Sequence, residues 1–203
     1  RGLRGGGSFV LRSPEPLQPP ARCVGEWLEH WAEATPDAVA FAEPAAGGAW
    51  VKLGWRALRQ RVGAVAQALL DLQLPAGKPV VVLSDNSLDH LVLELACMHV
   101  GRAICPVTSG YSRLAQGDYT RIHGILATLG PALVYASDAK VYGPPLASSG
   151  VDAVAVFSQG AETFPGALAF DSLRGTAESP AVMKAFEAIL PDDHAKYLLT
   201  SGS

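Results

Sequence analysis

The sequence predicts an α/β fold: a doubly wound, mostly parallel sheet flanked by helices and preceded by a small helix and a hairpin. Three observations predict it. The strand segments are uniformly apolar, they alternate with helical segments, and one strand–helix unit takes roughly 25 residues. Parallel strands buried on both faces read as continuous apolar runs, and each needs a crossover that a helix can supply. We therefore expect residues 79–157 to form the core of the sheet.

The N-terminal region is expected to be an extended arm, residues 1–22, that lies on an α/β subdomain formed by residues 23–203. Four prolines exclude a regular helix there, namely Pro14, Pro16, Pro19 and Pro20. The first eight residues are rich in Gly and Arg and lack the apolar stretch of a signal peptide.

A helix and a hairpin are predicted next. Apolar residues at i, i+3, i+4 and i+7 indicate one apolar helix face that ends at Thr35-Pro36-Asp37, and these residues are Val24, Trp27, Leu28 and Trp31. The segments Val39–Glu43 and Trp50–Leu53 are typical of short strands, and Gly47-Gly48 supplies a turn between them.

A longer helix follows, and its apolar side is formed by Trp55, Leu58, Val62, Val65, Leu69 and Leu70. Arg56, Arg59 and Arg61 are expected on the side that faces water. The helix should end before Pro75 and Gly77, which do not continue a helix.

Beyond this helix the strand–helix alternation defines the sheet. Strands are expected at 79–84, 103–107, 132–136, 151–157 and 196–200. Helices are expected at 88–100, 118–129, 138–147 and 181–190, the third of them interrupted by Pro144 and Pro145.

Composition excludes several classes of protein. The net charge of −3 argues against a nucleic-acid binder, and a hydrophobic fraction of 49% argues against intrinsic disorder. No apolar run approaches the roughly 20 residues of a membrane span, so we expect no membrane partner. The cysteines Cys23, Cys97 and Cys105 are odd in number and form no C-x-x-C pair, which favours reduced thiols and a cytoplasmic location.

Several familiar sites are absent from the sequence. The first α/β strand is followed by Ser84-Asp85-Asn86-Ser87 in place of a G-x-G-x-x-G fingerprint, which argues against a dinucleotide-binding dehydrogenase. No Walker A loop, no G-x-S-x-G elbow and no H-x-x-x-H pair occurs. We expect no metal site and no catalytic residue, and each histidine is expected to have a surface or capping role.

The last residues carry the chemical signal. The segment Lys196–Thr200 is expected to be a strand that runs directly into Ser201, Gly202 and Ser203. Such a junction can form a nest of backbone N–H groups that holds phosphate oxygens, and the hydroxyls add donors. An ordinary Ser/Gly turn is the alternative reading of these four residues taken alone.

Four stretches of the chain resemble the N-terminal part of the adenylate-forming acyl- and aryl-CoA synthetases, and the resemblance spans about residues 23–203. The stretches are residues 31–40, residues 66–70 with 79–87, residues 98–107, and residues 196–203. The last is similar to the opening of the family's phosphate loop, [YF]-[TS]-S-G-[ST]-[TS]-G-x-P-K-G. Residues 88–107 and 121–126 are most similar to feruloyl-CoA synthetases.

The resemblance implies an acid–CoA ligase that uses ATP and Mg²⁺ to convert an aromatic carboxylic acid of the hydroxycinnamic type into an acyl-adenylate and then transfers the acyl group to CoA. Thr200, Ser201, Gly202 and Ser203 would contact the β- and γ-phosphates. The chain ends inside this loop, so we expect the remainder of the enzyme to be its main partner, with a homodimer as a further option, and the 203-residue chain to be inactive alone.

Two alternatives stay open. The acid could belong to another class, such as a fatty or a different aryl acid. The chain could instead be a non-catalytic, receiver-like α/β domain, which would need acidic residues after its first strand, where Asp85 and Asp89 are found. The segment Pro106–Tyr111, after the second parallel strand, is interpreted as structural.

Overall fold

A five-stranded parallel sheet forms the centre of the molecule. The computed structural model describes residues 2–4, 8–17, 19–45 and 47–200. The spatial order of the strands is β6-β5-β7-β8-β9. Their bounds are β5 (Val80–Val82), β6 (Ile104–Pro106), β7 (Leu133–Asp138), β8 (Val154–Gln159) and β9 (Leu168–Ala169). The strand β6 lies on one side of β5, and β7, β8 and β9 follow one another on the other side, which confirms the doubly wound sheet.

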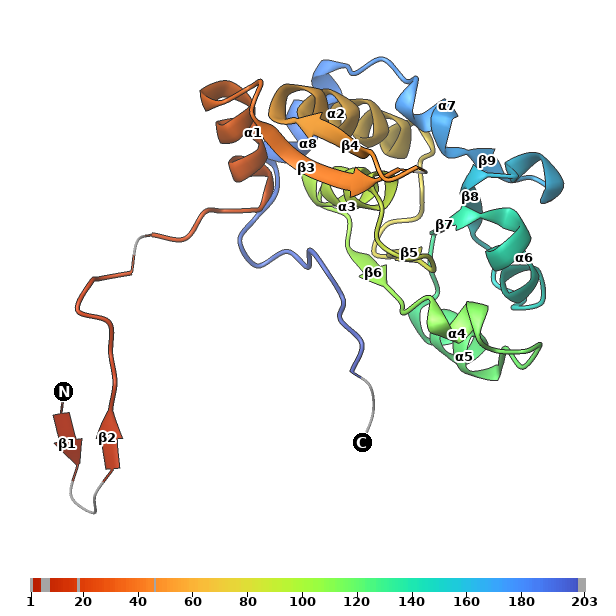
Figure 1. The fold of residues 1–203 in the computed structure, drawn as a ribbon, viewed down its shortest axis with the longest axis horizontal. Coiled ribbons are helices and arrows are strands. Elements are labelled where there is room, and N and C mark those ends of the chain that lie inside the picture. Colours follow the sequence, from red (N-terminus) through yellow and green to blue (C-terminus); the bar gives the residue numbers. More distant parts are fainter. Residues whose placement is uncertain (1, 5–7, 18, 46, 201–203) are drawn as a thin grey trace.

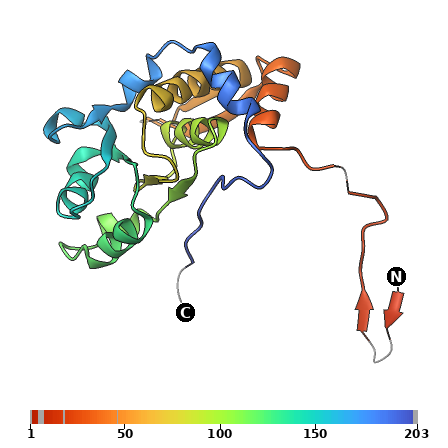
Figure 2. The ribbon, with the colours of Figure 1, turned by 180° about the vertical axis from the view of Figure 1, so that it is seen from behind.

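Two layers of helices cover the sheet (Figures 1 and 2). One layer contains α1 (Gly25–Ala34), α2 (Trp55–Asp71), α3 (Leu88–His99), α7 (Phe170–Arg174) and α8 (Pro180–Glu187). The other contains α5 (Thr120–Leu129) and α6 (Ala139–Ala147), beside α4 (Gly110–Arg113) and η1 (Ala161–Thr163). None of the described helices is long and apolar enough to cross a membrane.

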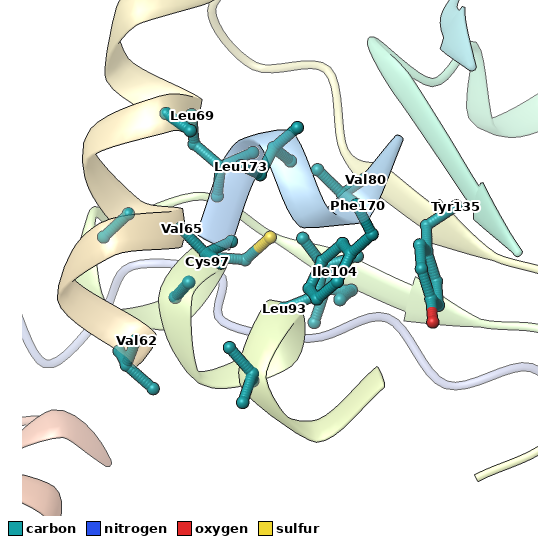
Figure 3. Packing of buried hydrophobic residues seen from close by; sticks show 14 of the residues in the cluster. Val62, Val65, Leu69, Val80, Leu93, Cys97, Ile104, Tyr135, Phe170 and Leu173 are labelled. Carbon is teal, nitrogen blue, oxygen red and sulfur yellow. The ribbon is translucent and has the colours of Figure 1, made fainter. Parts of the chain in front are cut away.

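The strands bury side chains on both faces. In β5, Val80 and Val82 pack in the cluster under α2 and α3, whereas Val81 packs in the cluster under α5 and α6. All three are fully buried, which is the reason that this strand is apolar at every position. Figure 3 shows the first cluster, in which Val65 and Cys97 from the helices pack together beside the sheet.

The predicted hairpin is confirmed as β3 (Val39–Pro44) paired antiparallel with β4 (Trp50–Gly54). Its turn closes with a 2.7 Å hydrogen bond from the Ala45 N–H to the Ala49 carbonyl. Gly48 has a φ of +82°, which glycine adopts without the steric cost of a Cβ atom. The hairpin lies over the helical layer of α2 and α3 and outside the parallel sheet (Figure 1).

Most helix expectations agree with the structure, and in α6 the predicted bounds agree but the predicted interruption was wrong. Pro144 and Pro145 were expected to interrupt this segment, but the helix continues from Ala139 to Ala147 through both. The helix is anchored at its start, where the Asp138 carboxylate accepts from the Lys140 N–H at 2.8 Å. At its end the Ser148 N–H donates to the Pro144 carbonyl at 3.2 Å.

The two ends of the chain differ from expectation. The arm carries a short hairpin, β1 (Gly2–Arg4) with β2 (Ser8–Val10), and both views show it extending away from the body, on which it was expected to lie (Figures 1 and 2). Residues 196–200, expected as a strand, form one isolated bridge at Lys196. The short elements α4, β9 and α7 were not predicted, because each is only two to five residues long.

Candidate functional site at the carboxyl edge of the sheet

The strand order places the candidate site at one edge of the sheet. The strands β5 and β7 are neighbours in the sheet, but the chain continues from β5 to β6 on one side and from β7 to β8 on the other side. In open α/β sheets, ligands bind in the crevice outside the carboxyl ends of the strands at such a switch point. The candidate site therefore lies at the carboxyl ends of β5 and its two neighbours, β6 and β7.

The segment that leads to the predicted phosphate loop reaches this same edge. The Ile104 N–H donates to the Ala195 carbonyl at 3.1 Å, and the Tyr197 N–H donates to the Ile104 carbonyl at 2.9 Å. These bonds align the segment parallel to β6, with an isolated parallel bridge between Ile104 and Lys196. Residues 198–200 consequently continue toward the carboxyl edge.

Thr200, a predicted phosphate contact, is exposed and follows this parallel segment. Ser201, Gly202 and Ser203, the other three residues of the predicted loop, lie outside the described residues. Among the residues that the structure describes, no group of three His, Cys, Asp or Glu side chains could hold a metal ion.

Asp85, directly after β5, is held by two donors from the segment after β6. The Ser109 hydroxyl and the Arg113 guanidinium both donate to its carboxylate. Burial, followed by the negative charge of Asp85, raises the pKa of the nearby Tyr142 phenol. Ser109, in the segment Pro106–Tyr111 that was interpreted as structural, thus ties the ends of β5 and β6 together.

Asp89 belongs to a different network, one residue into α3. Its carboxylate accepts from the Ser158 hydroxyl at 2.7 Å and from the Arg174 guanidinium at 3.0 Å. Ser158 also shares a 2.8 Å hydrogen bond with the buried Tyr135 hydroxyl, and burial raises the pKa of Tyr135 to about 12. Because Asp85 and Asp89 have separate cationic partners, the acidic cluster of a receiver-like domain is not favoured.

The comparisons with known proteins decide the family. Residues 28–203 match the family described as AMP-binding enzyme. The chain belongs to the AMP-binding enzyme family.

Relatives of known structure share the fold of this AMP-binding enzyme. An acyl-CoA synthetase of Brucella canis superposes with a TM-score of 0.64 at 18% identity, covering 87% of this chain and 31% of that one. The N-terminal subdomain of NpsA from Klebsiella oxytoca superposes with a TM-score of 0.60 at 20% identity, covering 90% of this chain and 39% of that one. At these identities the likeness shows the fold alone.

A curated relative is similar in sequence. The hybrid PKS-NRPS synthetase mycA of Thermothelomyces thermophilus is 33% identical over 104 residues, which cover 51% of this chain and 2% of that protein. The chain thus spans well under half the length of each of these three relatives. Nothing in these likenesses points to feruloyl-CoA synthetase in particular.

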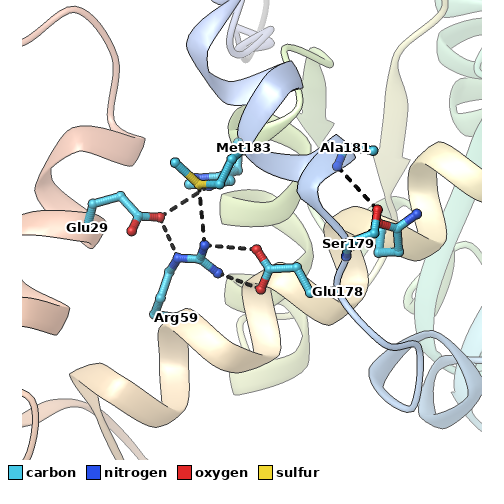
Figure 4. Close-up of polar contacts among 8 residues, drawn as sticks. Glu29, Arg59, Glu178, Ser179, Ala181 and Met183 are labelled. Carbon is cyan, nitrogen blue, oxygen red and sulfur yellow. Dashed lines mark hydrogen bonds and ion pairs between the residues drawn. The ribbon is translucent and has the colours of Figure 1, made fainter.

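The helical layer of this AMP-binding enzyme contains an ionic cluster that the sequence did not predict. Arg59 of α2 was expected to face water, but its side chain is only 17% exposed. The guanidinium donates two hydrogen bonds of 2.9 Å to the Glu178 carboxylate and another to Glu29 of α1 (Figure 4). Burial alone would lower the pKa of Arg59, but the hydrogen bond and charges of Glu178 and the charge of Glu29 raise it.

Two histidines of the AMP-binding enzyme are buried, so their expected surface or capping role was wrong. His99 is fully buried and stacks on Phe186 with ring centroids 4.4 Å apart. Burial, together with the positive charge of Arg59, lowers the pKa of His99 to about 4. The second, His90, is 6% exposed in the first turn of α3.

The cysteines agree with the expectation of reduced thiols. Cys23, Cys97 and Cys105 are free, and the last two are fully buried. Burial raises the pKa of both the Cys97 and the Cys105 thiol, so neither is set up as a nucleophile.

Proposed function

We propose that this chain is the N-terminal portion of an ATP-dependent acid–CoA ligase. The observation that carries the proposal is the parallel segment beside β6, which directs Thr200 to the carboxyl edge of the sheet in a chain of the AMP-binding enzyme family. The next residues of the motif, Ser201-Gly202-Ser203, follow immediately in the sequence.

The residues of this chain would act by holding phosphate. The Thr200 hydroxyl and the N–H groups and hydroxyls of residues 201–203 are donors of the kind that bind phosphate oxygens. Gly202 lacks a Cβ atom, so the backbone can approach the phosphates closely. When bound, ATP with Mg²⁺ would supply the adenylyl group that activates the carboxylate, and CoA would supply the thiol that receives the acyl group.

For the substrate we propose a hydroxycinnamic acid of the feruloyl type. This finer proposal is supported by the resemblance of residues 88–107 and 121–126, which form α3 with β6 and the first half of α5. We also propose that the main partner is the remainder of the enzyme, that a homodimer is an option, and that the protein works in the reducing cytoplasm without a nucleic-acid or membrane partner. The free buried thiols support the reducing compartment.

A second candidate function is an adenylation domain of the nonribosomal-peptide type. The similarity to the hybrid synthetase mycA favours it, since that protein shares 33% identity over 104 residues with this chain. The two candidates share acid activation and differ in the acyl acceptor, which is CoA in one and a carrier-protein thiol in the other.

The test is acid-dependent exchange of labelled pyrophosphate into ATP by the enzyme that contains this chain. We expect exchange with ferulate and related acids, and feruloyl-CoA when CoA is added. Exchange with amino acids, without thioester formation on CoA, would favour the adenylation domain. Absence of exchange with any acid would contradict both candidates.

Replacement of the Ser201 hydroxyl tests whether the predicted loop residues bind phosphate. Ser201→Ala removes one phosphate donor and should lower kcat/KM about tenfold or more, since a lost hydrogen bond to a charged group costs roughly 1.5–3 kcal/mol. Thr128→Ala, on the exposed surface of α5, is the matched control and should leave the rate unchanged. The 203-residue chain alone should form no CoA thioester, and thioester formation by it would contradict the proposal.

A further inference from the structure

A cavity of about 390 Å³ lies between the hairpin and the first turns of α3. Phe41 and Pro44 of β3 and Leu91 of α3 contribute apolar walls. The polar groups that line it include Glu43, His90 and Glu94. Its volume lies within the range of small-molecule sites, which are mostly apolar with a few convergent polar groups. Thr200, the one predicted phosphate contact among the described residues, does not line it.

At the N-terminus of α3, beside this cavity, two backbone N–H groups already donate to acceptors within the chain. The Ser87 hydroxyl accepts from the His90 N–H at 3.1 Å, and a carboxylate oxygen of Glu43 accepts from the Leu88 N–H at 2.7 Å. An anion would have to compete with both groups for the same N–H donors. The cavity therefore does not offer the usual anion site of an open helix N-terminus.

His90 also lines the cavity, and its ring is buried. Its side chain is only 7% exposed, and neither ring nitrogen has a hydrogen-bond partner among the described residues. The Glu94 carboxylate lies 3.5 Å from Nε2, a long contact that orients the ring. With Nε2–H toward that carboxylate, Nδ1 carries a lone pair and can accept a hydrogen bond. Buried polar groups are normally paired, so the ring lacks a donor.

The charges around the cavity favour a cation. Two carboxylates, Glu43 and Glu94, line it, and the Lys196 ammonium lies 2.6 Å from Oε1 of Glu94 and offsets one of them. Glu43 bonds the helix through one oxygen only, and its other oxygen has no partner among the described residues. The site thus offers a carboxylate oxygen beside apolar walls.

We propose that this cavity binds a small organic cation, namely a primary ammonium group carried on a compact apolar body. The ammonium group would donate to Glu43, and the apolar body would lie against Phe41, Pro44 and Leu91. Charge-assisted hydrogen bonds to the carboxylate give orientation, and burial of the apolar body gives affinity. The inference rests on this cavity alone and does not depend on the proposed ligase function.

The experiment measures binding of 2-phenylethylamine to the protein by calorimetry, in the absence of ATP and of any acid substrate. Neutral 2-phenylethanol and anionic 3-phenylpropanoate are the matched probes of similar size. We expect the amine to bind at least tenfold more tightly than the alcohol and the carboxylate not to bind. Equal binding of amine and alcohol, or tighter binding of the carboxylate, would overturn the proposal.

Variants locate the site. Glu43→Gln keeps an oxygen that can accept from the Leu88 N–H and removes the negative charge, so it should weaken amine binding about tenfold. Leu91→Trp fills the cavity and should abolish binding, while Glu187→Gln on the exposed side of α8 should leave it unchanged. Amine binding that is insensitive to both cavity variants, or no amine binding by the wild type, would refute the assignment, whichever acid the enzyme activates.

Discussion

The parallel sheet and the β3–β4 hairpin are built from similar residues and have opposite environments. Val80, Val81 and Val82 of β5 are fully buried, whereas Val39, Trp50 and Val51 of the hairpin are 55%, 60% and 44% exposed. The difference lies in their cover, because helices pack on both faces of the sheet and the hairpin contacts helices on one side only (Figure 1). An apolar run therefore predicts a strand but does not predict whether that strand is buried. Burial depends on which other elements of the chain pack against the strand.

Truncation of one apolar side chain in each region gives the largest expected contrast. Leu133→Ala empties a fully buried position in β7 and should lower the free energy of unfolding by about 3 kcal/mol, because transfer and cavity costs add. Val51→Ala removes a side chain that already contacts water and should cost less than about 1 kcal/mol. Urea unfolding of both variants measures the two values. Similar losses would show that the hairpin is buried in solution.

The same contrast exists for charges along α2, where it should be somewhat smaller. Arg59 is shielded between Glu29 and Glu178, whereas Arg56 pairs with Asp37 at 3.6 Å and both of those side chains are more than half exposed. Arg59→Met leaves two half-buried carboxylates without their cation and should cost about 2–3 kcal/mol. Arg56→Met should cost less than about 0.5 kcal/mol, since exposed ion pairs contribute little. Equal effects in urea unfolding would mean that the Arg59 cluster is solvated.

His99 gives the smallest of the three effects, and it depends on pH. Its folded pKa of about 4 lies below the ordinary 6.5, so the unfolded chain binds the proton more readily and acid destabilises the fold. Between pH 7 and pH 5 the free energy of unfolding should fall by about 2 kcal/mol from this group. His99→Phe, which keeps a ring beside Phe186, should remove that part of the pH dependence.

Unfolding of wild type and His99→Phe should be compared in urea at pH 7, 6 and 5. Glu94, whose pKa is lowered chiefly by its contact with His90, contributes stability that is lost only below its ordinary pKa of 4.5, so this contribution changes little between pH 7 and pH 5. His30, which is exposed on α1, supplies the control variant His30→Phe. Identical pH profiles for wild type and His99→Phe would contradict the assignment.

The sequence predicted the elements whose signals are local. Continuous valines identified β5, the Gly47-Gly48 turn identified the hairpin, and apolar residues at helical spacing identified α2 and α3. The environment of Arg59 could not be predicted, because its partners Glu29 and Glu178 are 30 and 119 residues away in the chain. Helical periodicity relates a residue to its own helix and says nothing about which distant carboxylate will meet it.

For the candidate site, the sequence identified the motif and the structure supplied the direction of the segment that carries it. Thr200 follows the pairing of residues 195–197 with β6, a contact no local pattern specifies. The strand expected at 196–200 is limited to one bridge, since the exposed Leu198 and Leu199 have no ladder partner among the described residues. The cavity beside His90 could not be predicted from a sequence motif, because its walls come from two elements about 45 residues apart.

The pairing of Ile104 with Lys196 also has a consequence for the order of folding. The two residues are 92 positions apart, so the outer edge of β6 stays uncovered until nearly the whole described chain has been synthesised. Contacts of such long sequence separation form slowly, and an open strand edge is a template for pairing with other chains. Release of the nascent chain before residue 196 has docked would therefore expose the β6 edge to aggregation, and the Lys196–Glu94 ion pair would mark the moment at which that edge is closed.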